Sequence, residues 1–146
     1  GFLAMTLRNV LLALVLMPLL PINGVLAHGD GAPQPVDTTG LQPLGEEWLP
    51  TNPYRDNEKL HDIAVEIGSR GYNSNCARCH GLEVKSGGMA PDLRELGEGE
   101  SEDAWFISRV LQGATVGGRQ KMPPFEGLLN QEAIWAIRTY IDAQPE

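Results

Sequence analysis

The chain has only two cysteines, and they stand three residues apart with a histidine directly after them, in the run Cys76-Ala77-Arg78-Cys79-His80. The spacing C-x-x-C-H is the attachment signal for c-type haem. At the end of a helix, residues three apart lie on one face, so two thiols can bond one porphyrin while the adjacent imidazole reaches the iron. The run therefore predicts one covalent haem c, with His80 as the proximal iron ligand.

Two other interpretations of the cysteines are weaker. A disulfide or thioredoxin-type redox pair normally stands beside a βαβ pattern, which the sequence lacks. A zinc site would need a fourth ligand, and the sequence offers no second Cys/His cluster to supply it. The export signal described next favours haem, because haem is attached to such motifs outside the bacterial cytoplasm.

Residues 1–27 have the pattern of an export signal. A polar start with Arg8 leads into an apolar run over residues 10–22, and Val25-Leu26-Ala27 places small residues where a signal peptidase cleaves. The apolar run is shorter than the ~20 residues that cross a bilayer, and prolines interrupt it. We expect cleavage after Ala27, a periplasmic mature protein and no membrane insertion afterwards; an uncleaved membrane anchor is the alternative.

Residues 28–59 are predicted to form a Pro-rich N-terminal arm. Prolines and glycines recur throughout the segment and leave no helical or strand period, so the arm is expected to be irregular. The arm has more apolar residues than a free linker, which indicates that it lies over the domain that follows. These apolar residues are Leu41, Leu44, Trp48, Leu49 and Tyr54. A partner-docking arm is the alternative.

Residues 60–146 are predicted to form a small all-α domain with long Gly/Pro-rich loops and no convincing strand. A first helix of roughly three turns begins near Leu60, and its apolar stripe consists of Ile63, Ala64, Ile67, Gly68 and Tyr72. A domain this small with long loops usually needs a disulfide, metal or cofactor at its centre. The haem predicted above would fill that role.

Two further helices are predicted. One begins at Ser101 as N-cap and ends at Gly113, and its buried face consists of Trp105, Phe106, Ile107 and Val110. The last helix begins at Asn130 as N-cap and has Ile134, Ile137 and Ile141 on one face.

The second ring nitrogen of His80 needs an acceptor that fixes the tautomer of the imidazole. The candidate is the backbone carbonyl of Pro91, eleven residues further along the chain, with Leu93 packing beside the haem.

Four residues are candidates for the sixth iron ligand. Met122 is favoured because it precedes two prolines that stiffen its loop just before the last helix. Met89 follows the haem motif closely and is better explained as haem-pocket packing. His61 is better explained as an exposed side chain. His28, the expected mature N-terminus, is a weak candidate for copper chelation.

Net charge argues against a nucleic-acid partner. The formal net charge is −8, the wrong sign for a protein that neutralises phosphates. Docking to partners is expected to use an apolar patch at the haem edge or basic patches of the partner. An acidic stretch is either a docking face or a solvated turn, and it contains Glu95, Glu98, Glu100, Glu102 and Asp103.

With these residues in place the chain resembles class I monohaem cytochromes c over about residues 60–143. Gly68 and Tyr72 match the family's small-plus-aromatic pair on the first helix, and Ile137, Tyr140 and Ile141 match the last helix that crosses it. Residues 88–93 match the loop whose proline carbonyl supports the proximal histidine, and Met122-Pro123 matches the distal ligand loop. The resemblance implies iron held by His80 and Met122.

A narrower resemblance is to the PedF-type soluble cytochromes c. It rests on residues 44–48, 51–55, 75–83 and 85–88. The resemblance implies that electrons come from a PQQ-dependent alcohol dehydrogenase, a quinoprotein, in the periplasm and pass to a terminal oxidase or another cytochrome.

The expected function is therefore single-electron transfer without catalysis. One alternative is a haem-based sensor or enzyme whose distal site is open to a small ligand. The other is a cytochrome subunit docked permanently to a dehydrogenase.

Overall fold

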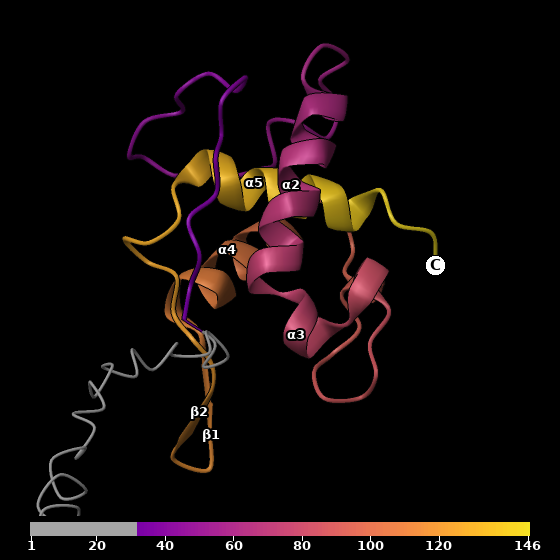
Figure 1. Ribbon diagram of the computed structural model, residues 1–146. Helices are drawn as coiled ribbons and strands as arrows, with labels where there is room; N and C mark the ends of the chain where they lie inside the picture. The colour runs from indigo at the N-terminus through magenta and orange to yellow at the C-terminus, as the bar shows by residue number, and fades with distance from the viewer. Residues whose placement is uncertain (1–31) are drawn as a thin grey trace, which may run out of the picture.

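A computed structural model of the protein describes residues 32–146 and is shown in Figure 1. The predicted export signal and His28 lie outside the described residues. The fold is mostly helical, which confirms the predicted all-α class, and its elements follow the order α2 (His61–Asn75), α3 (Ala77–His80), η1 (Leu82–Val84), η2 (Leu93–Glu95), α4 (Glu100–Gln112), β1 (Ala114–Val116), β2 (Arg119–Met122) and α5 (Gln131–Asp142). Within residues 32–146, no helix has the length and apolar character needed to span a membrane.

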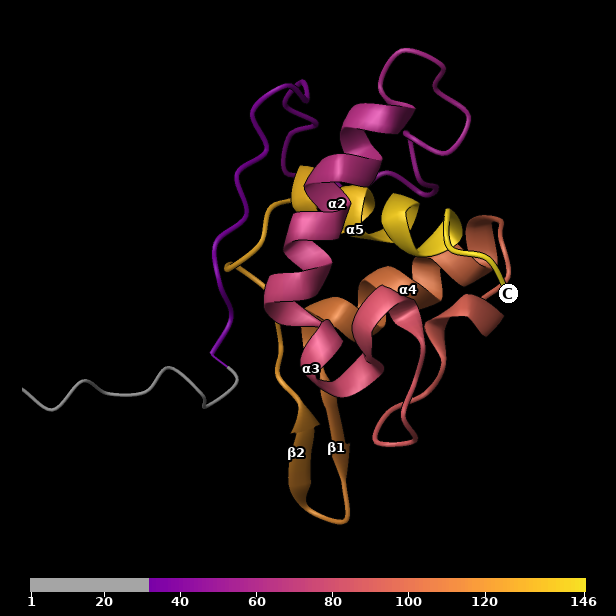
Figure 2. The same ribbon diagram turned by 45° about the vertical axis from the view of Figure 1, so that its right-hand side comes forward.

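Helices α2 and α5 cross in close contact, as Figures 1 and 2 show. The contact depends on Gly68, because a side chain there would overlap the backbone carbonyl of Ala136. One turn further along α2, the ring of Tyr72 packs on that of Tyr140, with centroids 5.3 Å apart. The predicted stripe on the first helix is thus the crossing face, except that Ile63 is 38% exposed.

Helix α5 is buried on all sides, including its polar residues. It begins where the sequence predicted, since the side chain of Asn130 accepts a hydrogen bond from the amide of Ala133 at 2.9 Å. A helix with no solvent face must satisfy its polar side chains internally. Gln131, Glu132, Arg138 and Thr139 therefore bond to other segments or to the helix itself.

Residues 32–59, the described part of the N-terminal arm, contain no helix or strand and lie over α5 and α2. Its residues Leu41 and Tyr54 are buried. The side chain of Gln131 accepts a hydrogen bond from the amide of Leu49 at 2.7 Å and donates to the carbonyl of Glu47 at 2.8 Å, while Glu132 accepts one from the amide of Leu44 at 2.5 Å. The first turn of α5 thus holds the arm by its backbone.

A buried ion cluster fastens the end of the arm to α4 and α5. Arg55 from the arm donates two hydrogen bonds to Asp103, at 2.7 and 2.8 Å, and two to Asp142, at 3.0 and 3.2 Å. Arg138 of α5 lies 3.4 Å from the same Asp103 carboxylate and has no exposed surface. The Asp103 side chain has none either, and its remaining partner is the amide of Asn52 at 2.9 Å.

The second helix begins earlier than predicted, and one of the four residues predicted for its buried face is exposed. Helix α4 is capped by Gly99, two residues before Ser101. Its buried residues are Asp103, Phe106, Ile107 and Val110, whereas Trp105 is 48% exposed. The buried residues have the i, i+3, i+4, i+7 spacing of one helix face, and Trp105 lies off that face. Asp103 can be buried on it because the ion cluster pairs its charge.

The prediction that no strand forms was also wrong. β1 and β2 pair as an antiparallel hairpin, with Thr115 opposite Gln120 and Val116 opposite Arg119. The turn is Gly117-Gly118, and both residues have positive φ, at 58° and 74°. Two glycines between short segments favour this type of hairpin turn.

Candidate haem site

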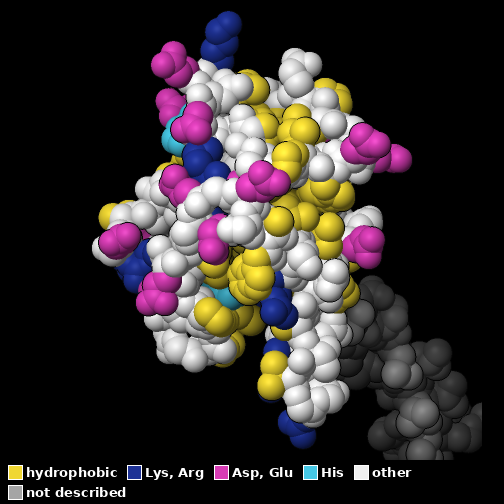
Figure 3. Space-filling view, turned by 180° about the vertical axis from the view of Figure 1, so that it is seen from behind, with side chains coloured by type: hydrophobic (Ala, Val, Ile, Leu, Met, Phe, Trp, Pro, Cys, Tyr) yellow, Lys and Arg dark blue, Asp and Glu magenta, His cyan; other side chains and the backbone are white. Residues whose placement is uncertain are grey.

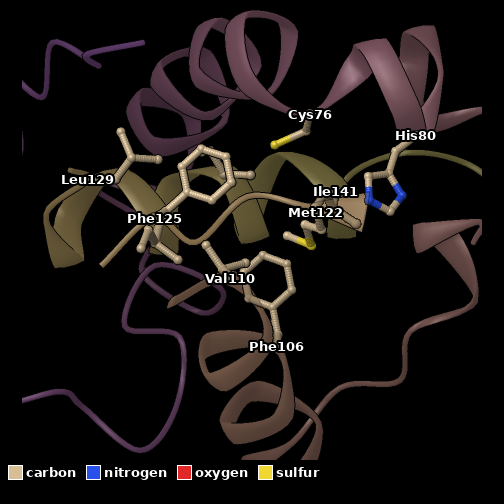
Figure 4. Close-up of a pocket in the computed structure, with 10 residues that line it drawn as sticks. Cys76, His80, Phe106, Val110, Met122, Phe125, Leu129 and Ile141 are labelled. Carbon is tan, nitrogen blue, oxygen red and sulfur yellow. The ribbon is translucent and has the colours of Figure 1, made fainter. Parts of the chain in front are cut away.

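A small apolar cavity, open at its mouth, lies between the end of α2, α4, α5 and the segment after β2. Figure 4 shows its lining side chains. They are Cys76, His80, Phe106, Val110, Met122, Phe125, Leu129, Ile134, Ile137 and Ile141. The cavity therefore brings together one cysteine, the histidine and the favoured methionine of the predicted site within an otherwise hydrocarbon surface.

The Cys-x-x-Cys-His run is helical, as its spacing requires. Cys76 caps the short helix α3, and its carbonyl accepts hydrogen bonds from the amides of Cys79 at 3.1 Å and His80 at 2.9 Å. Both cysteines are free thiols. Burial, and to a smaller extent the neighbouring Cys79, raises the pKa of the Cys76 thiol to about 12. Cys79 is half-buried and is not among the lining residues.

The imidazole of His80 is held by the Pro91 carbonyl. His80 Nδ1 lies 2.9 Å from that oxygen. Because a carbonyl only accepts, Nδ1 must carry the proton, and Nε2 is left as the lone-pair nitrogen. The sequence analysis predicted a contact between His80 and the Pro91 carbonyl, and in the structure the two groups lie within hydrogen-bonding distance.

The loop that joins the motif to Pro91 is fastened at its start. The hydroxyl of Tyr72 donates to the carbonyl of Gly81 at 2.7 Å, and burial raises the pKa of Tyr72 above its ordinary value. Gly81 has φ 91°, and a side chain there would overlap the carbonyl of Lys85. This turn needs glycine, and it directs the chain away from His80 immediately after the imidazole is placed.

Met122 lines the cavity from a segment distant in the sequence from the Cys-x-x-Cys-His run. It is the last residue of β2, and its half-buried side chain lines the cavity (Figure 4). Gly113 packs against its backbone so closely that a side chain there would overlap the Met122 carbonyl. Beyond the two prolines, the amide of Phe125 donates to the carbonyl of Val110 at 3.0 Å. The methionine is therefore fixed on both sides by contacts to α4 and its C-cap.

The other predicted residues lie elsewhere. Leu93 is partly buried against the core but is not a lining residue. Met89 is 77% exposed. His61 begins α2, at the end away from Cys76, and its side chain is 39% exposed beside Asp62. Neither Met89 nor His61 lines the cavity.

Of the lining residues outside the predicted site, five were predicted only as buried helix faces, and two were not predicted at all, Phe125 and Leu129. They follow Met122 by three and seven residues, which is the spacing of one face of a helical turn. That spacing was the available signal, but the intervening prolines and Gly127 made the segment look like a loop only.

The residues present fit a covalent haem. The cavity is apolar, as a macrocycle requires, and its polar lining groups are a thiol, an imidazole with a free Nε2 and a thioether. Imidazole and thioether are the axial donors found in cytochromes c, and thiols are the groups that attach c-type haem. His80 and Met122 would hold the iron, and Cys76 with Cys79 would form the covalent links.

Helical fold and haem-binding residues together define a small c-type cytochrome. A family model described as cytochrome c oxidase, cbb3-type, subunit III matches residues 63–141. The chain is 53% identical to cytochrome c550 of Pseudomonas aeruginosa over 137 residues, which cover 93% of this chain and 94% of that protein. The protein therefore belongs to the cytochrome c family, and it is a haem-based electron carrier rather than an enzyme.

Two proteins of Pseudomonas putida each contain a segment that is similar to part of this chain. It is 37% identical to quinohemoprotein alcohol dehydrogenase ADH IIB over 79 residues and 31% identical to quinohemoprotein alcohol dehydrogenase ADH-IIG over 78 residues. These matches cover 53% of this chain but only 11% and 10% of the two dehydrogenases. No solved structure matches the chain.

Proposed function

We propose that the protein carries single electrons in the periplasm with one haem c, bound through Cys76 and Cys79 and ligated by His80 and Met122. Its donor is a quinoprotein (PQQ-dependent) alcohol dehydrogenase, and its acceptor is a terminal oxidase or another cytochrome. Residues 1–27 are removed on export, residues 28–59 form the arm and residues 60–146 the cytochrome domain.

One observation carries the ligand assignment: His80 and Met122, 42 residues apart in the sequence, line the same apolar cavity. Met89 and His61, the competing donors, are exposed to solvent. The hydrogen bond from His80 Nδ1 to Pro91 leaves Nε2 free for iron. A histidine and methionine pair also favours a higher reduction potential, which suits a protein that accepts electrons.

The chain's own residues explain why such a site transfers electrons and does little else. When bound, haem supplies a one-electron couple at its iron. Phe106, Val110 and Ile141 exclude water from the cavity. The contacts that fix Met122 and His80 keep both ligands in place, so the protein needs little rearrangement when the charge of the site changes.

The dehydrogenase donor is supported by the relatives. Two proteins named quinohemoprotein alcohol dehydrogenases contain a segment similar to this chain. A separate chain with the same kind of domain is suited to receive electrons from an enzyme of that class. Mixing the alcohol-reduced dehydrogenase with the oxidised protein should reduce its haem at a rate that rises with the concentration of either protein; no reduction would exclude this donor.

The ligand assignment is tested by absorption spectra of haem-loaded Met122→Ala and Met89→Ala proteins. The oxidised parent should show the weak far-red band of sulfur bound to ferric haem iron. Met122→Ala should lose the band and bind carbon monoxide when reduced, whereas Met89→Ala should keep the parent spectrum. A parent that lacks the band and binds carbon monoxide would instead indicate an open distal site and a ligand-binding or catalytic haem.

Export is tested by the mass of the protein recovered from the periplasm. Cleavage after Ala27 should leave a chain that begins at His28, with the added mass of one haem. Recovery in the membrane fraction at full length would show an uncleaved anchor.

A further inference from the structure

Positive charge is concentrated in one region of this acidic protein. From Ala104 to Phe125 the sequence contains no Asp or Glu, although the whole chain has a net charge of −8. The same stretch contains Arg109, Arg119 and Lys121. The lower end of the molecule in Figure 3, where the β1–β2 hairpin projects, accordingly shows Lys and Arg side chains without Asp or Glu.

The hairpin cations are exposed and have no carboxylate partner. Figures 1 and 2 show the hairpin extending away from the helices. Within residues 32–146, neither Arg119 nor Lys121 forms an ion pair, in contrast to the exposed cations Arg70 and Lys85, each of which pairs with a carboxylate. Val116, opposite Arg119 in the hairpin, is 63% exposed. The hairpin thus presents unpaired positive charge beside an apolar side chain.

An aromatic residue adjoins the base of the hairpin. Arg109 stacks over the ring of Trp105, with Cζ 5.4 Å from the ring centroid, and its Nη1 donates to the carbonyl of Gly113 at 3.4 Å. Trp105 is 48% exposed. Exposed Trp and Arg are the residues that most often dominate binding energy at protein interfaces. We call the combined surface the basic face; it consists of Trp105, Arg109, Val116, Arg119 and Lys121.

The basic face is joined directly to the cavity. β2 ends at Met122, which pairs with Ala114 at the base of the hairpin. A molecule held at the basic face therefore lies on the Met122 side of the haem site.

The opposite end of α4 carries the opposite charge. Glu98, Glu100 and Glu102 precede or begin the helix, and Arg109 lies in its last turn. A helix of this length separates its ends by about 20 Å. The resulting charge asymmetry would turn the hairpin towards a negatively charged surface during approach.

We propose that the basic face docks the protein's redox partner through an acidic surface on that partner, on the Met122 side of the haem. This proposal rests on the proposed function as an electron carrier and adds the chemistry by which the partner is recognised. It differs from the expectation that docking uses an apolar patch at the haem edge or basic patches of the partner.

The test compares two charge reversals of equal size. Arg119→Glu with Lys121→Glu alters the basic face; Lys59→Glu with Arg70→Glu alters exposed cations before and on α2. Each pair is made in the haem-loaded protein, and its absorption and circular dichroism spectra should match those of the parent. Two rates are measured: reduction by the alcohol-reduced quinoprotein dehydrogenase, and oxidation by ferricyanide, an anion that takes one electron from the ferrous protein and becomes ferrocyanide.

The hairpin variant should react about tenfold more slowly than the α2 variant with both reagents at low salt, because steering by local charge changes association rates on this scale. The difference should largely disappear near 0.5 M salt, where charges are screened. Adding the dehydrogenase to the parent protein should also shift backbone amide resonances of residues 113–121.

Equal rates for the two variants with ferricyanide would overturn the proposal. So would a slower ferricyanide reaction combined with an unchanged dehydrogenase reaction, because the basic face would then attract anions without docking the partner. If the dehydrogenase fails to reduce the parent protein, the donor in the proposed function is wrong, and the ferricyanide comparison alone decides whether the basic face controls electron exchange with negatively charged partners.

Discussion

Gly68 of α2 lies against the backbone carbonyl of Ala136 in α5, in a space that any larger side chain would overlap. A methyl group at Gly68 would also stand 2.9 Å from the Cβ of Tyr140. Both neighbours belong to a buried helix, so neither can yield without moving α5. We expect Gly68→Ala to lower the free energy of unfolding by about 3 kcal/mol or more, measured by chemical denaturation of the haem-loaded protein.

The matched control is Gly87→Ala, because no atom lies within 4 Å of a Cβ at that position. Its free energy of unfolding should stay within about 0.5 kcal/mol of the parent. Similar losses in both variants would show that the α2–α5 crossing is not the sensitive contact.

Gly113 should control the position of Met122. It caps α4 with φ 70°, and a side chain there would overlap the Met122 carbonyl and lie 2.9 Å from backbone atoms of Pro123 and Pro124. In Gly113→Ala the strand that carries Met122 must move, so the far-red band of sulfur-bound ferric haem should weaken or vanish. Gly118→Ala, with a positive φ but open space around it, should keep the band; loss of the band in both would mean that hairpin strain alone displaces the methionine.

Gln131 should determine whether the arm stays on the helices. Its side chain bonds to the backbone of Leu49 and Glu47 and also accepts from Trp135 Nε1 at 3.1 Å. Gln131→Ala leaves the buried Trp135 Nε1 without an acceptor and releases the arm backbone at Leu49 and Glu47, so it should cost about 2 kcal/mol of unfolding free energy. Amide hydrogen exchange at Leu49 should speed up selectively.

The control for this prediction is Gln112→Ala, at an exposed position in the last turn of α4. It should change neither the exchange at Leu49 nor the free energy of unfolding by more than about 0.5 kcal/mol. Unchanged exchange in Gln131→Ala would show that the other contacts, namely the Glu132 bond to Leu44 and the ion cluster, are enough to hold the arm.

Asp103 should stabilise the fold in a pH-dependent way. Burial alone would raise its pKa, but hydrogen bonds from Arg55 and from the Asn52 amide outweigh burial and lower the pKa below its ordinary value. Such a carboxyl contributes stability above the pKa of the unfolded chain, near 4, and the contribution is lost as pH falls through the lower folded-state pKa. Asp103→Asn should therefore cost about 3 kcal/mol at pH 7, and the gap to the parent should narrow below pH 4.

The pKa of Asp142 is shifted in the opposite direction to that of Asp103, so its effect on stability should change with pH in the opposite sense. Burial raises its pKa despite the attraction of Arg138 and Arg55. A raised carboxyl pKa means that ionisation weakens the fold as pH rises, so Asp142→Asn should become less harmful from pH 4 to pH 7. Denaturation curves of both variants at several pH values measure the two trends; parallel trends would contradict the assignment of the cluster charges.

The parts that sequence predicts well here depend on local chemistry. Asn130 caps α5 through its own side chain, and the hydrogen bond from His80 to Pro91 spans a short loop. Both follow from residues near one another in the chain. The class of the fold follows from the haem motif and the helical periods for the same reason.

The parts that sequence missed depend on distant partners. Nothing near Asp103 in the sequence shows that Arg55 and Arg138 pair with it, so a charged residue on the buried stripe was unexpected and Trp105 was placed inside. The hairpin was missed because its strands are short and polar, although its Gly-Gly turn carried a signal.

The hydrogen bonds between α5 and the arm join the first and last described segments of the chain, so neither segment can reach its final position without the other. The two hydrogen bonds from the arm amides to Glu132 and Gln131 join residues 88 and 82 positions apart. Contacts of such long range form late in folding, because the loop between them must close first. Since a chain emerges from its N-terminus, the arm can bond to α5 only after residues 131–142 have appeared, although it can contact α2 earlier through Gln34 and Asn75. The wall that α5 gives to the cavity, which includes Ile134, Ile137 and Ile141, is missing for the same interval.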